Sequence, residues 1–340
     1  MPVLATPELA IHYRVEGAGP PLIMLHGATS TGDADFAAQL PAVRRAFRVY
    51  LPDARGHGQT RWDAGQGFSN EQLVADLEAF ADGLGLATFH LLGFSLGGLT
   101  ALSFATRRPE RLRTLVLIGV DVEREPRASV ARRLMDPARV EHDERDWADE
   151  LERRHGPGQG AGAWRRLLPA IAEDVAGQAL LTPRDLRRVR VPTLIVCGDR
   201  DVFVPAAHAV ALYHQLPDAR LLIAPGCDHQ VMVRRPGLFN EAAARFYRET
   251  EAIAIGRADG HPAPAPRPRQ PGLLQAATDG SAGAPSPLDI AEAAFDVRLF
   301  DPLWDERAEL AEPSGGDADA VSGRPPGAAG RRPAQPSGGR

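Results

Sequence analysis

The stretch LLGFSLGGLT, residues 91–100, places Ser95 between Gly93 and Gly97, directly behind an apolar run. The residues before it are typical of a buried strand and those after it of a helix, and a G-x-S-x-G sequence in this context predicts a nucleophilic serine. Glycines at 93 and 97 leave room for strand and helix backbones that approach closely around a strained turn. We expect Leu96 to begin the helix, so that its N–H group points toward negative charge developing on a substrate oxygen.

The sequence on both sides of this stretch alternates short apolar segments with amphipathic ones over residues 1–250. The apolar segments are bounded by Gly, Pro or Asp, as buried strands are. They are AIHYRV, PLIMLHG, FRVYLPDARG, TFHLLGFS, LRTLVLIG, PTLIVCGD and ARLLIAPG. In the clearest helix, SNEQLVADLEAFADGLG, Ser69 and Gln72 are a candidate capping box and Gly85 ends the helix. The alternation predicts a mainly parallel sheet with helices on both faces, and ligands bind beyond the carboxyl ends of such strands.

A serine hydroxyl is a weak nucleophile at neutral pH, so a general base and a group that orients this base are needed elsewhere in the chain. Two loops that follow expected strands supply candidates. Asp199 and Asp201 follow PTLIVCG, and His229 follows ARLLIAPG. Imidazole titrates near neutrality, and a carboxylate can fix its tautomer, so these residue types suit the two roles.

Five motifs in one order resemble the α/β-hydrolase superfamily over about residues 8–250. The motifs are LHG, PDARGHGQT, GFSLGG, GDRDVFVP and PGCDH. The resemblance implies an α/β-hydrolase fold. It also implies that Ser95 is the nucleophile, Asp201 the acid that orients the base, and His229 the general base.

The same resemblance implies an oxyanion hole, in which two donors stabilise the tetrahedral oxyanion. These donors are the backbone N–H groups of Leu96 and of Ala28, which follows His26 and Gly27. We expect His26 to pack in the loop beside the hole.

Other assignments remain open for the acid and for the histidine. Asp199 lies in the same turn as Asp201, and Asp121 follows the strand LVLIGV, where some members of the superfamily place their acid. His57 lies in ARGHGQT, a turn that the superfamily uses structurally. Cys227 lies two residues before His229, where a buried inert thiol and an oxidisable one are the two alternatives.

Residues 122–188 interrupt the strand pattern and are helical in character, with a break expected at GPGQGAG, residues 156–162. In the resemblance this segment is a small helical cap, inserted after the sixth strand, which covers the site and shapes the substrate pocket. It holds 13 Arg and 13 acidic residues, so no overall steering of a charged substrate follows. Arg124, Arg127 and Arg132 are candidates for binding a substrate carboxylate, with solvated helix faces as the alternative.

The composition changes near residue 255, because residues 251–340 hold 13 Pro and 12 Gly in 90 positions. Such a segment does not bury enough apolar area to offset its conformational entropy. We therefore expect a folded domain over residues 1–255 and a largely disordered tail over residues 256–340. Within the tail, residues 288–310 are a candidate short helix that docks on the domain, makes a weak contact with a partner protein, or stays disordered.

Composition excludes several other functions. A formal net charge of -5 leaves no basic footprint for nucleic acid. No apolar run approaches the roughly 18 residues of a membrane span, and the N-terminus lacks the pattern of a signal peptide. We expect a cytoplasmic protein with neither a nucleic-acid nor a membrane partner.

The chain contains no lysine, since all 39 basic residues are arginine. Mechanisms that need a lysine amine, such as a pyridoxal phosphate Schiff base or a P-loop, are therefore excluded. The two cysteines, Cys197 and Cys227, are expected to be reduced thiols. No residues have metal-ligand spacing and no dinucleotide fingerprint precedes a helix, so we expect no metal and no cofactor.

Three functions remain open. The first is a serine hydrolase that cleaves a small carboxylic ester or lactone through an acyl-enzyme, similar to 3-oxoadipate enol-lactonase and small cofactor-free esterases and perhydrolases. Serine rather than aspartate at position 95 argues against the related haloalkane dehalogenases and epoxide hydrolases. The second is a lyase or carbon-carbon bond hydrolase that uses the same triad. The third is a binding or receptor-like protein, because fold alone does not determine function.

Overall fold

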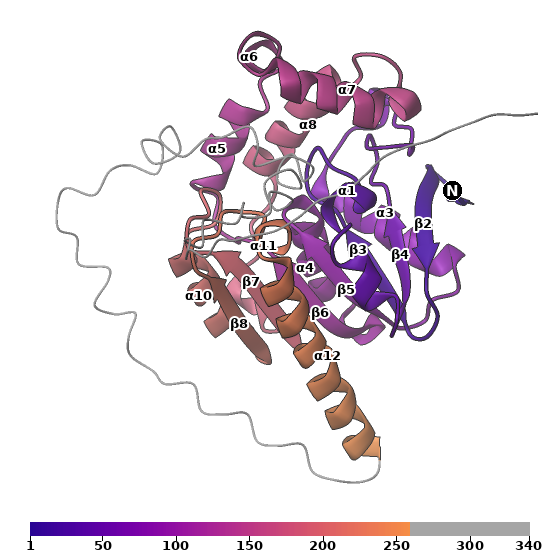
Figure 1. The fold of residues 1–340 in the computed structure, drawn as a ribbon, viewed down its shortest axis with the longest axis vertical. Helices are drawn as coiled ribbons and strands as arrows, with labels where there is room; N and C mark the ends of the chain where they lie inside the picture. The colour runs from indigo at the N-terminus through magenta and orange to yellow at the C-terminus, as the bar shows by residue number, and fades with distance from the viewer. Residues whose placement is uncertain (259–340) are drawn as a thin grey trace, which may run out of the picture. The chain divides into compact units, whose positions relative to one another are not determined.

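Eight strands form one sheet within residues 1–258, the part of the chain that this computed structural model describes (Figure 1). Their order is β1-β2-β4-β3-β5-β6-β7-β8. The bounds are β1 Val3–Ala5, β2 Ala10–Glu16, β3 Pro21–Leu25, β4 Arg48–Pro52, β5 Phe89–Phe94, β6 Leu112–Ile118, β7 Thr193–Gly198 and β8 Ala219–Ala224. β2 pairs antiparallel with β1 and β4, and the other neighbouring strands are parallel. The mainly parallel sheet expected from the sequence is confirmed.

Helices cover both faces of this sheet. Those of the described residues are α1 Gly32–Asp35, α2 Leu40–Val43, α3 Asn70–Gly83, α4 Leu96–Arg107, α5 Arg127–Leu134, α6 Pro137–Asp143, α7 Arg145–Gln159, α8 Trp164–Gly177, α9 Pro183–Leu186, α10 Ala206–Gln215, α11 Val231–Arg234 and α12 Pro236–Ala258. Two 3-10 helices, η1 Ala64–Gln66 and η2 Pro109–Arg111, complete the set. One core cluster joins the sheet to α3, α4 and α10, and a second joins it to α2, α11 and α12.

Neighbouring residues of the central strands pack into opposite clusters. Leu91 of β5 packs in the cluster that contains Phe80 of α3, and Leu92 packs in the cluster that contains Phe246 of α12. Side chains alternate between the two faces of a strand, and here both faces are buried. For this reason β5 is a continuous apolar run in the sequence, and its carboxyl end presents Ser95 at the edge of the sheet.

The cap lies between β6 and β7 and comprises α5 to α9, as the resemblance implies. Figure 1 shows α5 to α8 gathered at the top of the view. These helices have a hydrophobic cluster of their own, which includes Trp147, Leu151, Trp164 and Leu168. The cap is therefore held together by its own core as well as by its contacts with the sheet domain.

The expected break at residues 156–162 is partly wrong, because α7 continues through Gly156 and Pro157 to Gln159. The helix ends at Gly160, which has φ 93°. Tertiary contacts override the weak helix propensity of this segment. Gln159 Nε2 donates to the carbonyl oxygen of Thr60 at 2.5 Å, and Gln159 Oε1 accepts from the Trp62 N–H.

Helix α12 carries the described chain to Ala258, three residues beyond the boundary expected at residue 255. The predicted tail from residue 259 onward, with its candidate helix at 288–310, lies outside the described residues. Within residues 1–258 no helix combines the length and apolar character needed to cross a membrane. The cytoplasmic location, like the absence of nucleic-acid and membrane partners, stays a prediction.

Candidate active site

Ser95 lies in a strained turn between β5 and α4. Its backbone has φ 50° and ψ −113°, outside the regions that L-residues normally occupy. A Cβ at Gly93 would lie 2.3 Å from the carbonyl oxygen of Gly97, and a Cβ at Gly97 would lie 2.5 Å from the carbonyl oxygens of Leu25 and His26. The glycines therefore permit the close backbone approach that the sequence predicts, and the turn holds the serine hydroxyl at the pocket.

The structure brings together the three residues that the sequence proposes as a triad. His229 Nε2 lies 2.9 Å from Ser95 Oγ, and His229 Nδ1 lies 2.8 Å from Asp201 Oδ2. The other carboxylate oxygen, Oδ1, accepts hydrogen bonds from the backbone N–H groups of Phe203 and Val204, at 2.8 and 3.0 Å. Because both oxygens are engaged, Asp201 fixes the orientation of the imidazole and favours the tautomer with its proton on Nδ1.

The two alternative acids, Asp121 and Asp199, form hydrogen bonds with groups other than His229. Asp121 Oδ2 lies 2.6 Å from His208 Nδ1, and its Oδ1 accepts from the Glu123 N–H at 2.8 Å. The hydrogen bond from Asp121 raises the pKa of His208 above its ordinary value. Asp199 Oδ1 accepts from the Cys227 N–H at 3.2 Å. Among the three candidate acids, Asp201 is the one in hydrogen-bond contact with His229.

Three residues around the imidazole were not singled out by the sequence reasoning. The ring of His229 contacts the rings of Phe94 and Phe203, with centroids 5.0 and 4.6 Å away. Gly119, with φ 58°, follows β6, and a Cβ there would lie 2.7 Å from His229 Cε1. A glycine directly after an apolar strand was the available signal for this position. These three residues therefore pack closely around the imidazole that bonds to Asp201 and Ser95.

The expected oxyanion donors, Ala28 and Leu96, line the same pocket as Ser95 and His229. Among the described residues, neither backbone N–H group donates to a protein acceptor. The preceding loop is held in place because the Gly27 N–H donates to Asp35 Oδ2 at 2.8 Å. Burial raises the pKa of the Asp35 carboxyl group. Two unpaired N–H groups beside a serine hydroxyl form an arrangement that stabilises negative charge on a carbonyl oxygen.

Thr29, the residue after Ala28, forms hydrogen bonds with two histidines and an arginine. Thr29 has φ 61°, and its N–H donates to His57 Nε2 at 3.2 Å. Its carbonyl oxygen accepts from His155 Nε2 and Arg154 Nη1, both on cap helix α7, at 3.0 and 2.9 Å. His57 thus has the structural position expected of it, and the role of His155 was missed by the sequence reasoning because its partner lies 126 residues away.

Burial holds His57 and His155 as neutral rings. Burial, followed by the neighbouring charge of His26, lowers the pKa of His57 well below its ordinary value. Burial and then Arg154 lower the pKa of His155 to about 3. A neutral His155 accepts from the Gly58 N–H with Nδ1 and donates from Nε2 to Thr29, so the single ring joins two loops of the sheet domain to the cap.

The pocket is lined mainly by apolar side chains. The cap contributes Ala131, Met135, Ile171 and Val175. Besides His229, the charged or titratable residue in the lining is Arg127, the first residue of α5. The free space is about 40 Å³. This is much smaller than the cavity of about 150 Å³ that accommodates benzene in an engineered protein.

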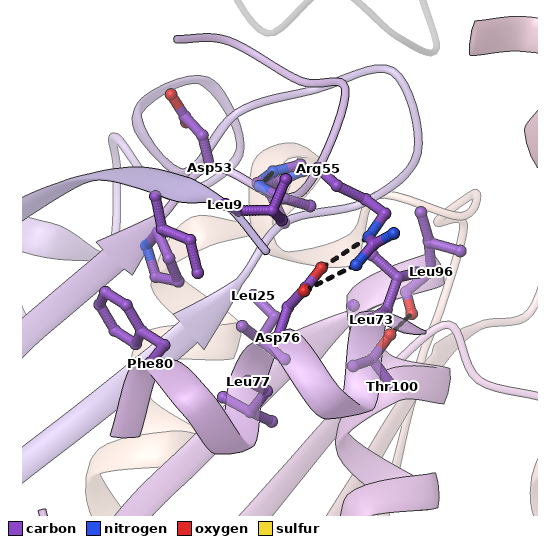
Figure 2. Close-up of a pocket in the computed structure, with 15 residues that line it drawn as sticks. Leu9, Leu25, Asp53, Arg55, Leu73, Asp76, Leu77, Phe80, Leu96 and Thr100 are labelled. Atoms are coloured by element: carbon purple, nitrogen blue, oxygen red, sulfur yellow. Dashed lines mark hydrogen bonds and ion pairs between the residues drawn. The ribbon is translucent and has the colours of Figure 1, made fainter. Parts of the chain in front are cut away.

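A second cavity, of about 50 Å³, lies beside α3 and α4 and has a different lining (Figure 2). Its polar lining includes the buried Arg55, which binds both carboxylate oxygens of Asp76 at 2.7 and 2.8 Å. Leu96 borders it, but Ser95 and His229 do not. This cavity is therefore separate from the candidate active site.

The other two candidate arginines, Arg124 and Arg132, are not part of the pocket lining. Arg124 Nη2 donates to the carbonyl oxygen of Gln178 and Nη1 to that of Ala176, at the end of α8, and Arg132 is exposed. Cys227 is buried, and burial raises the pKa of its thiol. No group of His, Cys, Asp or Glu side chains suited to a metal ion occurs in the described part of the chain. The absence of a metal and a cofactor stays a prediction.

Comparisons with known proteins agree with the fold. A family model described as alpha/beta hydrolase fold matches residues 20–139. The solved structure of an enol-lactonase from Burkholderia xenovorans is similar in fold, with a TM-score of 0.59 and 23% identity, covering 73% of this chain and all of that one.

Curated relatives add sequence similarity over most of their length. A 2-hydroxy-6-oxo-2,4-heptadienoate hydrolase of Pseudomonas putida is 30% identical over 238 residues, which cover 64% of this chain and 86% of that protein. A pimeloyl-[acyl-carrier protein] methyl ester esterase of Nitrosomonas europaea is 32% identical over 251 residues, covering 68% and 96%. Together with the strained turn at Ser95, the sheet order and the cap, these similarities show that the chain belongs to the α/β-hydrolase family.

Proposed function

We propose that this protein is a serine hydrolase that cleaves a small carboxylic ester or lactone through an acyl-enzyme intermediate. The observation that carries the proposal is the continuous hydrogen-bond chain from Ser95 Oγ through the imidazole of His229 to Asp201. Nucleophile, base and orienting acid in this geometry are what acyl transfer requires.

In the proposed mechanism, Ser95, His229 and Asp201 act together in acyl transfer. Ser95 Oγ attacks the substrate carbonyl carbon while His229 Nε2 takes the hydroxyl proton, and Asp201 stabilises the resulting imidazolium through Nδ1. The N–H groups of Ala28 and Leu96 bind the oxyanion. His229 then returns the proton to the leaving alkoxide. Water activated by the same base hydrolyses the acyl-enzyme and releases the acid.

The names of relatives support this chemistry at the level of reaction class. One relative is a methyl ester esterase, and one structure of similar fold is an enol-lactonase. The apolar pocket with its limited free space suits a short acyl group rather than a long chain.

A carbon-carbon bond hydrolase is the second candidate, favoured by the relative of 30% identity. That relative is named for a 2-hydroxy-6-oxo-dienoate, which has a ketone and no ester, so its hydrolysis must cleave a carbon-carbon bond. The same serine and histidine can serve both reactions, because both need a proton acceptor and stabilisation of an oxyanion. The two candidates differ in the substrate that is turned over.

The test is hydrolysis of a panel of p-nitrophenyl acyl esters and simple lactones, beside a 6-oxo-dienoate, by the wild type and Ser95→Ala. Ser129→Ala is the matched control, since this cap hydroxyl bonds to Glu125 and not to the site. We expect ester or lactone turnover that is lost in Ser95→Ala and kept in Ser129→Ala. Turnover of the dienoate alone would favour the second candidate, and no turnover by the folded wild type would favour the binding or receptor-like alternative.

A further inference from the structure

Arg127 places a buried positive charge in the wall of the pocket. It begins α5 and shares the pocket lining with Ser95 and His229, and it is 6% exposed. The cap side chains beside it in the lining, Ala131 and Met135, are apolar. A charge in an apolar, partly closed wall is costly unless a partner compensates it.

The described partners of Arg127 are neutral acceptors. Nε and Nη2 donate to the carbonyl oxygen of Glu123 at 3.4 and 3.3 Å, and Nη1 donates to Gln178 Oε1 at 2.8 Å. These three bonds use three of the five N–H groups of a guanidinium. Within residues 1–251, no carboxylate forms an ion pair with it, so two N–H groups remain for a ligand.

The nearby acids, Asp121 and Asp174, act on Arg127 at longer range and form no hydrogen bond with it. Asp121 Oδ2 lies 2.6 Å from His208 Nδ1, and Asp174 Oδ1 accepts from the Asn70 N–H at 2.8 Å, while the buried Asp174 Oδ2 has no hydrogen-bond partner among the described residues. Burial lowers the pKa of the Arg127 guanidinium, while Asp121 and Asp174 oppose this effect. A carboxylate binds a guanidinium through two parallel hydrogen bonds, roughly twice as strong as bonds to neutral acceptors. An anionic ligand would therefore compete well with Glu123 and Gln178 for this group.

We propose that Arg127 binds a carboxylate carried by the substrate, an inference that rests on the proposed function as a serine hydrolase. The substrate class is then a monoester of a short dicarboxylic acid, or a lactone of similar size that bears a carboxylate. The pocket binds the anion at Arg127 while the scissile carbonyl lies at Ser95 and the N–H groups of Ala28 and Leu96.

The test compares two esters of similar shape, mono-p-nitrophenyl glutarate and p-nitrophenyl 5-methylhexanoate, in which an isopropyl group replaces the carboxylate. We expect the wild type to prefer the glutarate, and Arg127→Met to lose about 10- to 100-fold in kcat/KM on it, as for loss of a charged hydrogen bond. The neutral ester should change little. Arg127→Lys should keep part of the preference, and Arg132→Met, which removes an exposed charge from the same helix, should keep all of it.

An equal loss on both esters in Arg127→Met would overturn the proposal, because it would show that Arg127 only stabilises the cap. A wild type without preference for the anionic ester would do the same.

A binding measurement separates this proposal from the proposed function. Glutarate should raise the thermal unfolding temperature of the wild type and of Ser95→Ala, while the neutral glutaramide should not. Arg127→Met should remove the glutarate effect. If neither ester is turned over, the proposed reaction fails while the anion site can still be demonstrated. If glutarate and glutaramide behave alike, the anion site fails whatever the esters show.

Discussion

His155 Nε2 lies 3.0 Å from the carbonyl oxygen of Thr29, so a cap helix holds the loop that carries Ala28. Replacing His155 by Leu removes this bond and the acceptor for the Gly58 N–H. We expect kcat to fall about tenfold with little change in KM, less than the 10²- to 10³-fold loss from deleting an oxyanion donor outright. Steady-state kinetics on a reactive ester measures this, with circular dichroism to verify folding. His142→Leu, at an exposed cap position, is the control, and equal kinetics in the two variants would refute a positioning role.

The choice of acid can be tested by three matched substitutions. Asp201→Asn keeps the shape of the side chain but favours the wrong tautomer of His229, so we expect kcat to fall by about 10⁴. Asp121→Asn and Asp199→Asn should retain most activity, since those carboxylates bond to His208 and to the Cys227 N–H. Near-normal activity in Asp201→Asn together with its loss in either other variant would move the acid role.

Gly119→Ala tests the space around the imidazole. The added Cβ would lie 2.7 Å from His229 Cε1 and would also strain a backbone with φ 58°. Gly85→Ala is the control, because Gly85 has φ 67° but no atom within 4 Å of the added Cβ. Both variants should lose about 1 kcal/mol of unfolding free energy through strain. We expect ester hydrolysis to fall only in Gly119→Ala, and a similar fall in both would show that strain alone is responsible.

The buried neutral His155 makes the unfolding free energy depend on pH. The pKa of His155 is about 3 in the folded protein, against an ordinary value of 6.5, so the unfolded chain binds the extra proton between these values. Its contribution to stability is complete above about pH 6.5 and declines as the pH falls toward 3. His155→Leu should flatten the dependence of unfolding free energy on pH by about 1.4 kcal/mol per unit in this window.

Comparing variants separates the contribution of His155 to the pH dependence of the unfolding free energy from the contributions of other titratable groups. Burial raises the pKa of Asp35 and of Asp174, and these groups act in the opposite sense where they titrate. Chemical denaturation at a series of pH values, with His142→Leu as the exposed control, measures the difference in slope. An unchanged slope in His155→Leu would mean that His155 is not neutral in the folded state.

The strained turn at Ser95 was predictable because its sequence signal is local. Gly93, Ser95 and Gly97 lie within five positions, and the composition of the residues on either side predicts a strand before them and a helix after them. The acid was harder to choose, since Asp121, Asp199 and Asp201 all follow strands at the same edge of the sheet. Which carboxylate reaches the histidine depends on the paths of the loops, which local sequence does not specify.

Contacts between distant segments escaped the sequence reasoning. His155 and Thr29 meet across 126 positions, and the pattern around His155 is that of an ordinary cap helix. The end of α7 was placed wrongly for a related reason, because contacts of Gln159 with a loop of the sheet domain stabilise a turn that its glycines and proline disfavour. Arg127 was one of three candidate arginines, and only packing shows which of them lines the pocket.

The role of Ser95 as nucleophile is tested by reaction with a p-nitrophenyl alkylphosphonate, whose phosphorus centre mimics the tetrahedral intermediate and stays bonded to the attacking residue. We expect release of about one p-nitrophenolate per protein, complete loss of ester hydrolysis, and a phosphonyl group on Ser95 by peptide mass spectrometry. Ser95→Ala should release none. Full ester hydrolysis after treatment with the phosphonate, or a phosphonyl group on another residue with Ser95 unmodified, would show that Ser95 is not the nucleophile.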